Sequence, residues 1–160
     1  MEFEIHGGKF NYEYGNIYRF YELKKGDEWK QIKLQTDSKK YKYFGFRVSN
    51  KRYNLKLHRL MYWLHNPDWD IMDSSQDNSI DHIDGNNQNN NIENLRVVTN
   101  QENSFNMTRA KGYHWDKTAK KWRATIALNG KVINLARFDK EIDARNCYLD
   151  AKKKYHIIKS

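Results

Sequence analysis

The first 50 residues contain four short segments in which apolar or aromatic side chains alternate with polar ones. Alternation with a period of two is typical of β-strands that bury one face. Turn-forming residues separate the segments, as at Lys25-Gly26-Asp27 and at Ser49-Asn50-Lys51. The pattern predicts a small β region over residues 1–54, with strands over 10–14, 16–23, 29–34 and 41–48.

Apolar residues then recur at helical spacing over residues 55–65, and the only proline of the chain, Pro67, follows them. Because proline cannot continue a helix, this helix is expected to end before Asn66. The next elements predicted are strands over 80–83 and 94–99, and a helix that Asn100 caps and that runs to about Met107.

The last third of the chain predicts a three-stranded antiparallel sheet with one helix. Asn129-Gly130 is the strongest short signal for a hairpin turn, and it joins the second strand to the third. Asp139 is expected to cap a helix that runs to about Tyr155. The strands are predicted over 114–117, 121–128 and 131–138, and the buried helix face over Ile142, Ala144, Cys147, Tyr148 and Ala151.

These elements predict an α+β fold in three parts. Residues 1–54 form the β region, and residues 55–107 form a central strand–loop–strand–helix unit. Residues 112–156 form the three-stranded antiparallel sheet packed on one helix.

Charge is distributed unevenly along the chain, whose formal net charge is +9. Residues 1–50 carry a net charge of +3, residues 51–107 carry −3, and residues 108–160 carry +9. This distribution favours a polyanion-binding module beside an acidic site that attracts metal ions. The alternative is a solvated, lysine-rich surface without a partner.

Composition excludes several other classes of protein. The single cysteine, Cys147, excludes an internal disulfide framework and a cysteine-based zinc site. The sequence shows no signal peptide and no apolar run long enough to cross a membrane, so we expect an intracellular protein without a membrane partner. No feature implies a protein partner.

The richest stretch for chemistry is 79–103, where an Asp-His pair precedes a loop crowded with asparagines. Hydrolysis of a phosphodiester needs a base for the attacking water, a hard cation and a group that orients the base. His82 suits the base, and Asp81 and Asn103 supply oxygen ligands of the kind that Mg²⁺ prefers. Asn94 is expected either to hold the imidazole or to brace the loop.

Other polar residues of this region have simpler explanations. Asp84 and Gly85 are typical turn formers. Residues 86–91 either shape the site or only fill the loop, and His58 is expected to pack or brace the fold because it lies in an amphipathic segment.

The central residues resemble the HNH endonuclease (ββα-metal) family, in its phage and intron-encoded homing-type branch. The likeness rests on 57–60, 81–86, 91–99 and Asn103. Asn94 follows His82 by twelve positions, and Asn103 follows Asn94 by nine. The resemblance implies that His82 is the general base, that Asn94 is the middle family residue, and that Asp81 and Asn103 bind the metal ion. It implies Mg²⁺ as cofactor, with Mn²⁺ as the alternative, and a 5′-phosphate and a 3′-hydroxyl as products.

Alternation along the predicted C-terminal strands sorts their side chains onto two faces. Trp122, Ala124, Ile126 and Leu128 should meet the helix, whereas Arg123, Thr125 and Ala127 should face outward. Asn134 should also face outward. The candidate DNA contacts are His114, Lys117, Arg123, Thr125, Lys131, Asn134 and Arg137.

Residues 112–156 resemble the Apetala-two/ethylene-response-factor (ERF) type of DNA-binding domain. The likeness rests on the Lys-Trp-Arg-Ala strand from Lys121, on the turn at 135–139 and on the alanine–tyrosine helix face. That family lays its sheet in the major groove of DNA. Thr125, Ala127 and Asn134 stand where plant members use arginine and tryptophan, so the plant sequence preference is not expected here.

The sequence therefore predicts a metal-dependent DNA endonuclease of the HNH homing type, with double-stranded DNA as partner and a site chosen by the C-terminal module. A phage, intron or viral origin fits this prediction. Two alternatives remain open: a DNA-binding regulator with an inactive nuclease fold, and an RNA-binding or RNA-cleaving protein.

Overall fold

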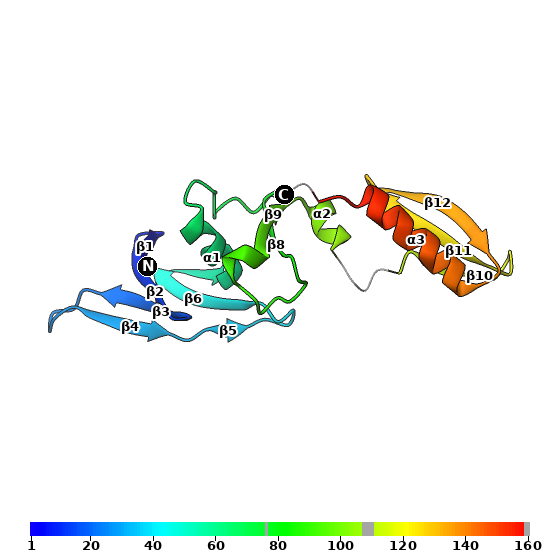
Figure 1. Ribbon diagram of the computed structural model, residues 1–160. Coiled ribbons are helices and arrows are strands. Elements are labelled where there is room, and N and C mark those ends of the chain that lie inside the picture. Colours follow the sequence, from blue (N-terminus) through cyan, green and yellow to red (C-terminus); the bar gives the residue numbers. More distant parts are fainter. Residues whose placement is uncertain (76, 107–110, 159–160) are drawn as a thin grey trace. The chain divides into compact units, whose positions relative to one another are not determined.

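The computed structural model describes residues 1–75, 77–106 and 111–158, and it confirms the α+β class (Figure 1). The chain divides into two compact units. The first comprises Met1–Ser74 with His82–Arg96, and the second comprises Ser75–Asp81 with Val97–Ser160. The boundary therefore passes through the central region, between Asp81 and His82.

Two antiparallel sheets begin the first unit. One has the strand order β1-β2-β3-β4, and the other has the order β5-β6-β7. Their strands are β1 (Glu2–Ile5), β2 (Gly8–Glu13), β3 (Asn16–Tyr21), β4 (Glu28–Ile32), β5 (Gln35–Thr36), β6 (Lys42–Val48) and β7 (Lys51–Lys56).

The predicted strands at 10–14, 16–23, 29–34 and 41–48 correspond to β2, β3, β4 and β6, whereas β1, β5 and β7 were not predicted. Ser49 and Asn50 both have positive φ angles, so they make a tight hairpin turn and the chain returns at once as β7. Leu55 and Lys56 consequently belong to this strand. The predicted helix start at residue 55 is therefore wrong, and α1 (Leu57–His65) begins two residues later.

Aromatic side chains fill the core of the first unit. The side chains of Phe10, Phe44 and Leu60 are fully buried. Phe10 meets Phe44 edge-on, with ring centroids 6.0 Å apart, and Trp63 of α1 meets Phe3 in the same way at 6.0 Å. This packing fixes α1 against both sheets, and α1 is the helix that carries His58.

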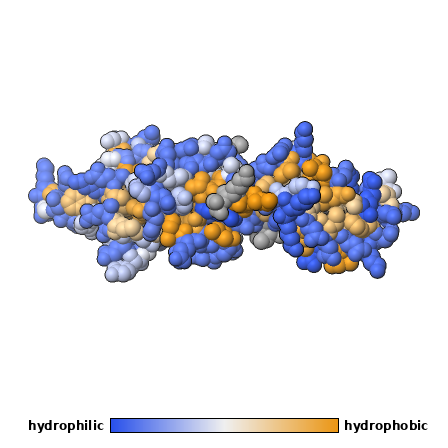
Figure 2. Space-filling view, turned by 45° about the horizontal axis from the view of Figure 1, so that its top comes forward, coloured by the Kyte–Doolittle hydropathy of each residue, from blue (hydrophilic) through white to orange (hydrophobic). Residues whose placement is uncertain are grey.

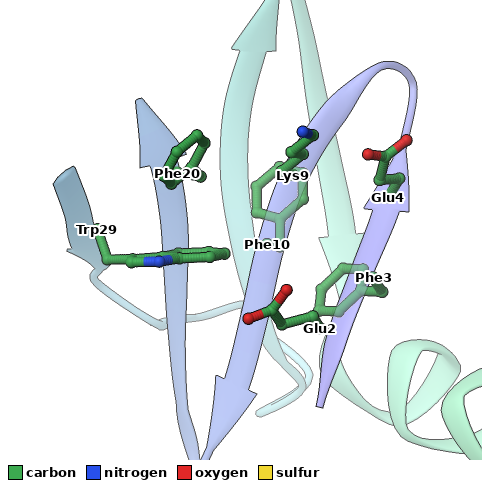
Figure 3. Close-up of a pocket in the computed structure, with 7 residues that line it drawn as sticks. All are labelled: Glu2, Phe3, Glu4, Lys9, Phe10, Phe20 and Trp29. Carbon is green, nitrogen blue, oxygen red and sulfur yellow. The ribbon is translucent and has the colours of Figure 1, made fainter. Parts of the chain in front are cut away.

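A surface pocket of about 490 Å³ lies over the first sheet (Figure 3). None of the predicted site residues lines it. Its lining residues are Glu2, Phe3, Glu4, Lys9, Phe10, Phe20 and Trp29.

The central region contains the expected strand–loop–strand–helix order. Strand β8 (Ser79–His82) pairs with β9 (Leu95–Val98), and a short 3₁₀ helix, η1 (Ile92–Asn94), precedes β9. Helix α2 (Asn100–Phe105) follows. Its cap is Thr99 rather than the predicted Asn100, because Thr99 and Glu102 form a reciprocal capping box. Met107, the predicted helix end, lies outside the described residues.

The C-terminal part contains the predicted sheet and helix: β10 (Tyr113–Asp116), β11 (Lys121–Leu128), β12 (Lys131–Phe138) and α3 (Glu141–Tyr155). Asn129 and Gly130 have positive φ angles and form the expected hairpin turn. Asp139 does not cap α3. Lys140 occupies the cap position, and the Asp139 carboxylate instead lies 3.3 Å from Nζ of Lys121.

Helix α3 packs on this sheet through Ala144, Tyr148 and Ala151. Cys147 is half-buried, whereas Ile142 is half exposed, so its predicted place on the buried face is wrong. Ile142 lies in the first turn of the helix and is not among its buried residues.

The described helices include none that combines the length and the apolar character of a membrane-spanning segment. On the face shown in Figure 2, hydrophilic residues cover most of the surface and hydrophobic residues gather in smaller patches between them.

Candidate functional site

His82 ends strand β8, and only 2% of its surface is exposed. Its Nε2 atom lies 3.1 Å from Oδ1 of Asn90, which belongs to the asparagine-rich loop. The loop therefore supplies a polar partner of the predicted base. Asn90 was one of the residues for which loop filling remained an open explanation.

Two aromatic rings pack beside His82 within the first unit. The His58 ring lies edge-on to the His82 ring, with centroids 5.3 Å apart, and the Tyr41 ring lies 5.9 Å from it. Tyr41 and His58 also contact each other at 4.9 Å. His58 thus packs as expected, and it packs directly against the predicted base.

His58 is 5% exposed, and its Nδ1 atom has no hydrogen-bond partner among the described protein atoms. The pKa of His58 is lowered to about 3, chiefly by burial and to a smaller extent by the neighbouring charges of His82, Lys56 and Arg59. A neutral imidazole therefore lies beside His82 at neutral pH.

The Asp84 carboxylate organises the asparagine-rich loop. It accepts hydrogen bonds from the backbone of Asn86 at 2.7 Å and from the side chains of Asn89 at 2.8 Å and Asn94 at 3.0 Å. The hydrogen bonds from Asn89, Asn86 and Asn94 lower the pKa of Asp84. Asp84 is therefore an ionised anchor of the turn that Gly85, with its positive φ, completes.

Asn94 braces this loop. Its Oδ1 atom accepts from the backbone N–H of Asp84 at 3.0 Å, and its Nδ2 atom donates to the carbonyl of Asn89 at 2.9 Å. Of the two roles left open for Asn94, the contacts support loop bracing. Its catalytic assignment stays a prediction.

Asp81 belongs to the second unit and is 6% exposed. The side-chain amide of Asn106 donates to both of its carboxylate oxygens, at 3.2 Å each. Asn103 lies one turn inside α2, where its backbone N–H donates to the carbonyl of Thr99 at 2.9 Å. The metal-binding roles of Asp81 and Asn103 stay predictions.

The two predicted ligands, Asp81 and Asn103, suit a hard cation by residue type. They offer a carboxylate and an amide oxygen, which Mg²⁺ and Mn²⁺ accept together with water and phosphate. Across residues 1–75, 77–106 and 111–158, no three His, Cys, Asp or Glu side chains gather into a metal-binding group. A set of one carboxylate and one amide would leave most of the coordination sphere to water and substrate.

The outer face of the C-terminal sheet carries most of the predicted DNA contacts. The strand register places Arg123 opposite His114 and Arg137, and Thr125 opposite Asn134. These residues share the face turned away from Ala124 and Ile126, which are buried against the helix. Lys117 lies in the turn after β10. Lys131 lies opposite Leu128 at the hairpin end of the two strands, so the register places it on the helix-facing side of the sheet rather than on the outer face.

Two arginines of this face have partners within the sheet. Arg123 donates to Oδ1 of Asn134, from Nε at 2.8 Å and also from Nη2. Nε of Arg137 lies 3.5 Å from the Asp116 carboxylate. Backbone hydrogen bonds, chiefly from Ala119, and then the charge of Arg137 lower the pKa of Asp116.

Sequence reasoning missed Asn90, Asn106 and Tyr41 as neighbours of the site. The residue type of Asn90 and Asn106 could have drawn attention to them, because asparagine forms helices and strands poorly. Many other asparagines of this stretch have the same property, so residue type alone does not single these two out. Tyr41 precedes His82 by 41 positions, so only the fold brings the two rings together.

Comparison with known proteins matches residues 55–105 to the family model of the HNH endonuclease. Two curated relatives are similar to this chain. Protein 3.8 of Escherichia phage T7 is 40% identical over 67 residues, which cover 38% of this chain and 55% of the relative. An uncharacterized HNH endonuclease, L560, of Acanthamoeba polyphaga mimivirus is 30% identical over 117 residues, which cover 68% and 59%.

A solved structure of DNA binding and cleavage by the HNH homing endonuclease I-HmuI is 27% identical in sequence to this chain. The match covers 66% of this chain and 56% of that chain with a TM-score of 0.45. The chain spans between half and two thirds of the length of the relatives it matches. The likeness of residues 112–156 to the Apetala-two/ERF type stays a prediction, whereas the HNH endonuclease family model covers residues 55–105.

Proposed function

We propose that this protein is a metal-dependent DNA endonuclease that hydrolyses phosphodiester bonds. The observation that carries the proposal is the burial of His82 and Asp81, consecutive residues inside the span that matches the HNH endonuclease model. Burying ionisable groups costs free energy, and such groups concentrate at functional sites.

His82 would take a proton from the water that attacks phosphorus. Asp81 and Asn103 would hold a divalent cation, which supplies charge neutralisation at the scissile phosphate and at the leaving 3′ oxygen. Cleavage of the P–O3′ bond then leaves a 5′-phosphate and a 3′-hydroxyl. Asn94 would contribute by keeping the loop after His82 in shape.

The C-terminal sheet would hold the DNA. Residues 108–160 carry a net charge of +9, and Arg123, Arg137 and Asn134 lie on one outer strand face. Arginine and asparagine side chains on such a surface suit contacts with phosphates and base edges. The viral sources of the two relatives support a phage or viral origin and action inside an infected cell.

Nicking of supercoiled plasmid DNA tests the proposal. The wild-type protein should relax the plasmid with Mg²⁺ or Mn²⁺ and not with EDTA, and His82→Ala should lower the rate at least a hundredfold, the usual contribution of a general base. Binding to DNA without cleavage in any divalent metal would instead indicate a regulator with an inactive nuclease fold. Preferential cleavage of structured RNA at matched salt would indicate a ribonuclease.

A further inference from the structure

The outer face of the C-terminal sheet changes in character from one end to the other. At one end, Arg123 pairs with His114 and Arg137 across the three strands. At the hairpin end, Ala127 pairs with Val132. Ala127 follows Arg123 by an even number of positions along β11, so the two lie on the same face. A face that carries arginines at one end therefore carries a pair of apolar side chains at the other.

Val132 stands out among the apolar residues of this module. It is 70% exposed, which makes it the most exposed of the large apolar residues described in 111–158. Apolar residues scattered singly over a surface are ordinary. Here Ala127 is also exposed, and Thr125, which carries a methyl group, precedes it by two positions on the same face. The three residues form a continuous methyl-bearing end of the outer face.

The nearest charged side chain does not cover this end. Oδ1 of Asn134 accepts from Nε of Arg123 at 2.8 Å and also from Nη2. Asn134 lies opposite Thr125, between the arginine row and the apolar pair. The contact therefore holds the guanidinium in the middle of the face, in agreement with the high exposure of Val132.

Charge and shape make duplex DNA the best candidate for the partner of this face. Residues 108–160 carry a net charge of +9, and strands can enter the major groove. In that groove thymine presents a methyl group, and apolar side chains recognise it by direct contact. An apolar end on an otherwise polar and cationic face therefore matches a thymine methyl group rather than a phosphate.

We propose that Val132, with Ala127 beside it, is a specificity-determining residue that contacts thymine methyl groups in the major groove. The inference rests on the proposed function for duplex DNA as the partner of this sheet. It does not depend on cleavage, so recognition by Val132 and hydrolysis in the central region can fail separately.

The strand geometry sets the distance between the two kinds of base contact. Ala127 follows Arg123 by four positions, which corresponds to about 13 Å along an extended strand. A strand that follows the groove spans roughly four base pairs over this length, at about 3.4 Å each. Arginine suits guanine. We therefore expect a thymine preference that depends on Val132 about four base pairs from a guanine preference that depends on Arg123.

Selection from a random-sequence duplex library tests the preference without any cleavage. The whole chain is incubated with the library in EDTA, as wild type, Val132→Ser and Ile142→Ser. The wild type should select thymine at one position at least, and Val132→Ser should weaken that preference by a factor of about three or more. Ile142 is half exposed on α3, so Ile142→Ser makes the same kind of change away from the outer face and should keep the preference.

Uracil in place of the selected thymine isolates the methyl group, because the two bases differ only there. In the wild type this replacement should raise the dissociation constant about fourfold, the usual contribution of one buried methyl group. Val132→Ser should respond by less than about 1.5-fold, since it has lost the apolar contact. Val132→Thr keeps one methyl group and the strand preference of a β-branched residue, so it should fold as wild type does and respond to an intermediate extent.

No thymine preference in the wild type would overturn the inference. So would an unchanged preference in Val132→Ser, an equal loss in Ile142→Ser, or the same response to uracil in wild type and Val132→Ser. A protein that selects thymine through Val132 and cleaves no DNA would contradict only the proposed nuclease. A protein that cleaves DNA without this selection would contradict only the inference.

Discussion

His82 and His114 have opposite surroundings. His82 is 2% exposed and meets Asn90, His58 and Tyr41, whereas His114 lies exposed on the outer face of the C-terminal sheet. Burial of an ionisable group is unfavourable unless its surroundings compensate. The contrast fits the proposal that the central region controls the state of one side chain, whereas the sheet presents several side chains to DNA.

The pattern of contacts differs in the same way. Asp84 accepts from three groups, and Asn94 is bound at both ends of its amide. Arg123 and Arg137, by contrast, each contact one side chain among the described residues and remain partly accessible. A site for chemistry needs one fixed geometry, whereas a surface that contacts phosphates can adjust to its ligand.

Asp81→Asn should produce the largest effect, and it should appear in catalysis alone. The change keeps the size of the side chain but removes the charge that would attract the cation, so we expect cleavage at 1 mM Mg²⁺ to fall roughly a thousandfold, about 4 kcal/mol in activation free energy. DNA affinity measured without metal should change less than about twofold. Undiminished cleavage would remove Asp81 from the predicted metal ligands.

Acid should destabilise the fold through His58. Its pKa in the folded protein is about 3, below the ordinary value of 6.5, so the unfolded chain binds the proton more tightly. The stability associated with neutral His58 is complete above pH 6.5 and is lost as the pH falls from 6.5 towards 3. Between pH 7.5 and pH 5 this amounts to about 2 kcal/mol, because each pH unit below 6.5 costs about 1.36 kcal/mol.

Urea unfolding at the two pH values measures this loss. His58→Phe, which keeps an aromatic ring, should reduce the difference in unfolding free energy by about 2 kcal/mol. His114→Phe makes the same change on the exposed sheet face and should leave the difference as in wild type. An equal response of the two variants would contradict the contrast between the two histidines.

Arg123→Ala should produce a smaller effect, confined to binding. Loss of one charged contact should weaken DNA binding by about 1 kcal/mol, roughly fivefold, and lower the slope of log affinity against log salt by about one. Arg145→Ala removes the same charge from an exposed position of α3 and serves as the matched control. Equal losses in both variants would indicate general electrostatic attraction rather than contact by the outer face.

Local signals explain why much of the fold was predictable. The strands 121–128 and 131–138 and the Asn129-Gly130 turn depend on neighbouring residues, and their bounds match the sequence prediction. Cap positions were less predictable. Asn100 and Asp139 are good capping residues by type, but Thr99 and Lys140 occupy the cap positions.

Contacts between distant segments explain what the sequence could not predict. The residue types of Asp81 and His82 and their order indicated the chemistry, but the neighbours of His82 described above come from α1, from the loop before β9 and from Tyr41. Which asparagine of a run faces the imidazole depends on how Asp84 folds the loop, and no residue pattern distinguishes Asn90 from Asn89 in advance.

The central claim is that His82 performs the chemistry and that the outer face of the C-terminal sheet binds DNA. It is tested most directly by measuring kcat and the dissociation constant for duplex DNA at fixed salt, for wild type, for His82→Ala and for the double variant Arg123→Ala/Arg137→Ala. We predict that His82→Ala lowers kcat at least a hundredfold with an unchanged dissociation constant. The double variant should raise the dissociation constant at least tenfold with kcat at saturating DNA within about threefold of wild type. A fall in kcat together with a rise in the dissociation constant in either variant would contradict the account. So would cleavage by His82→Ala at the wild-type rate.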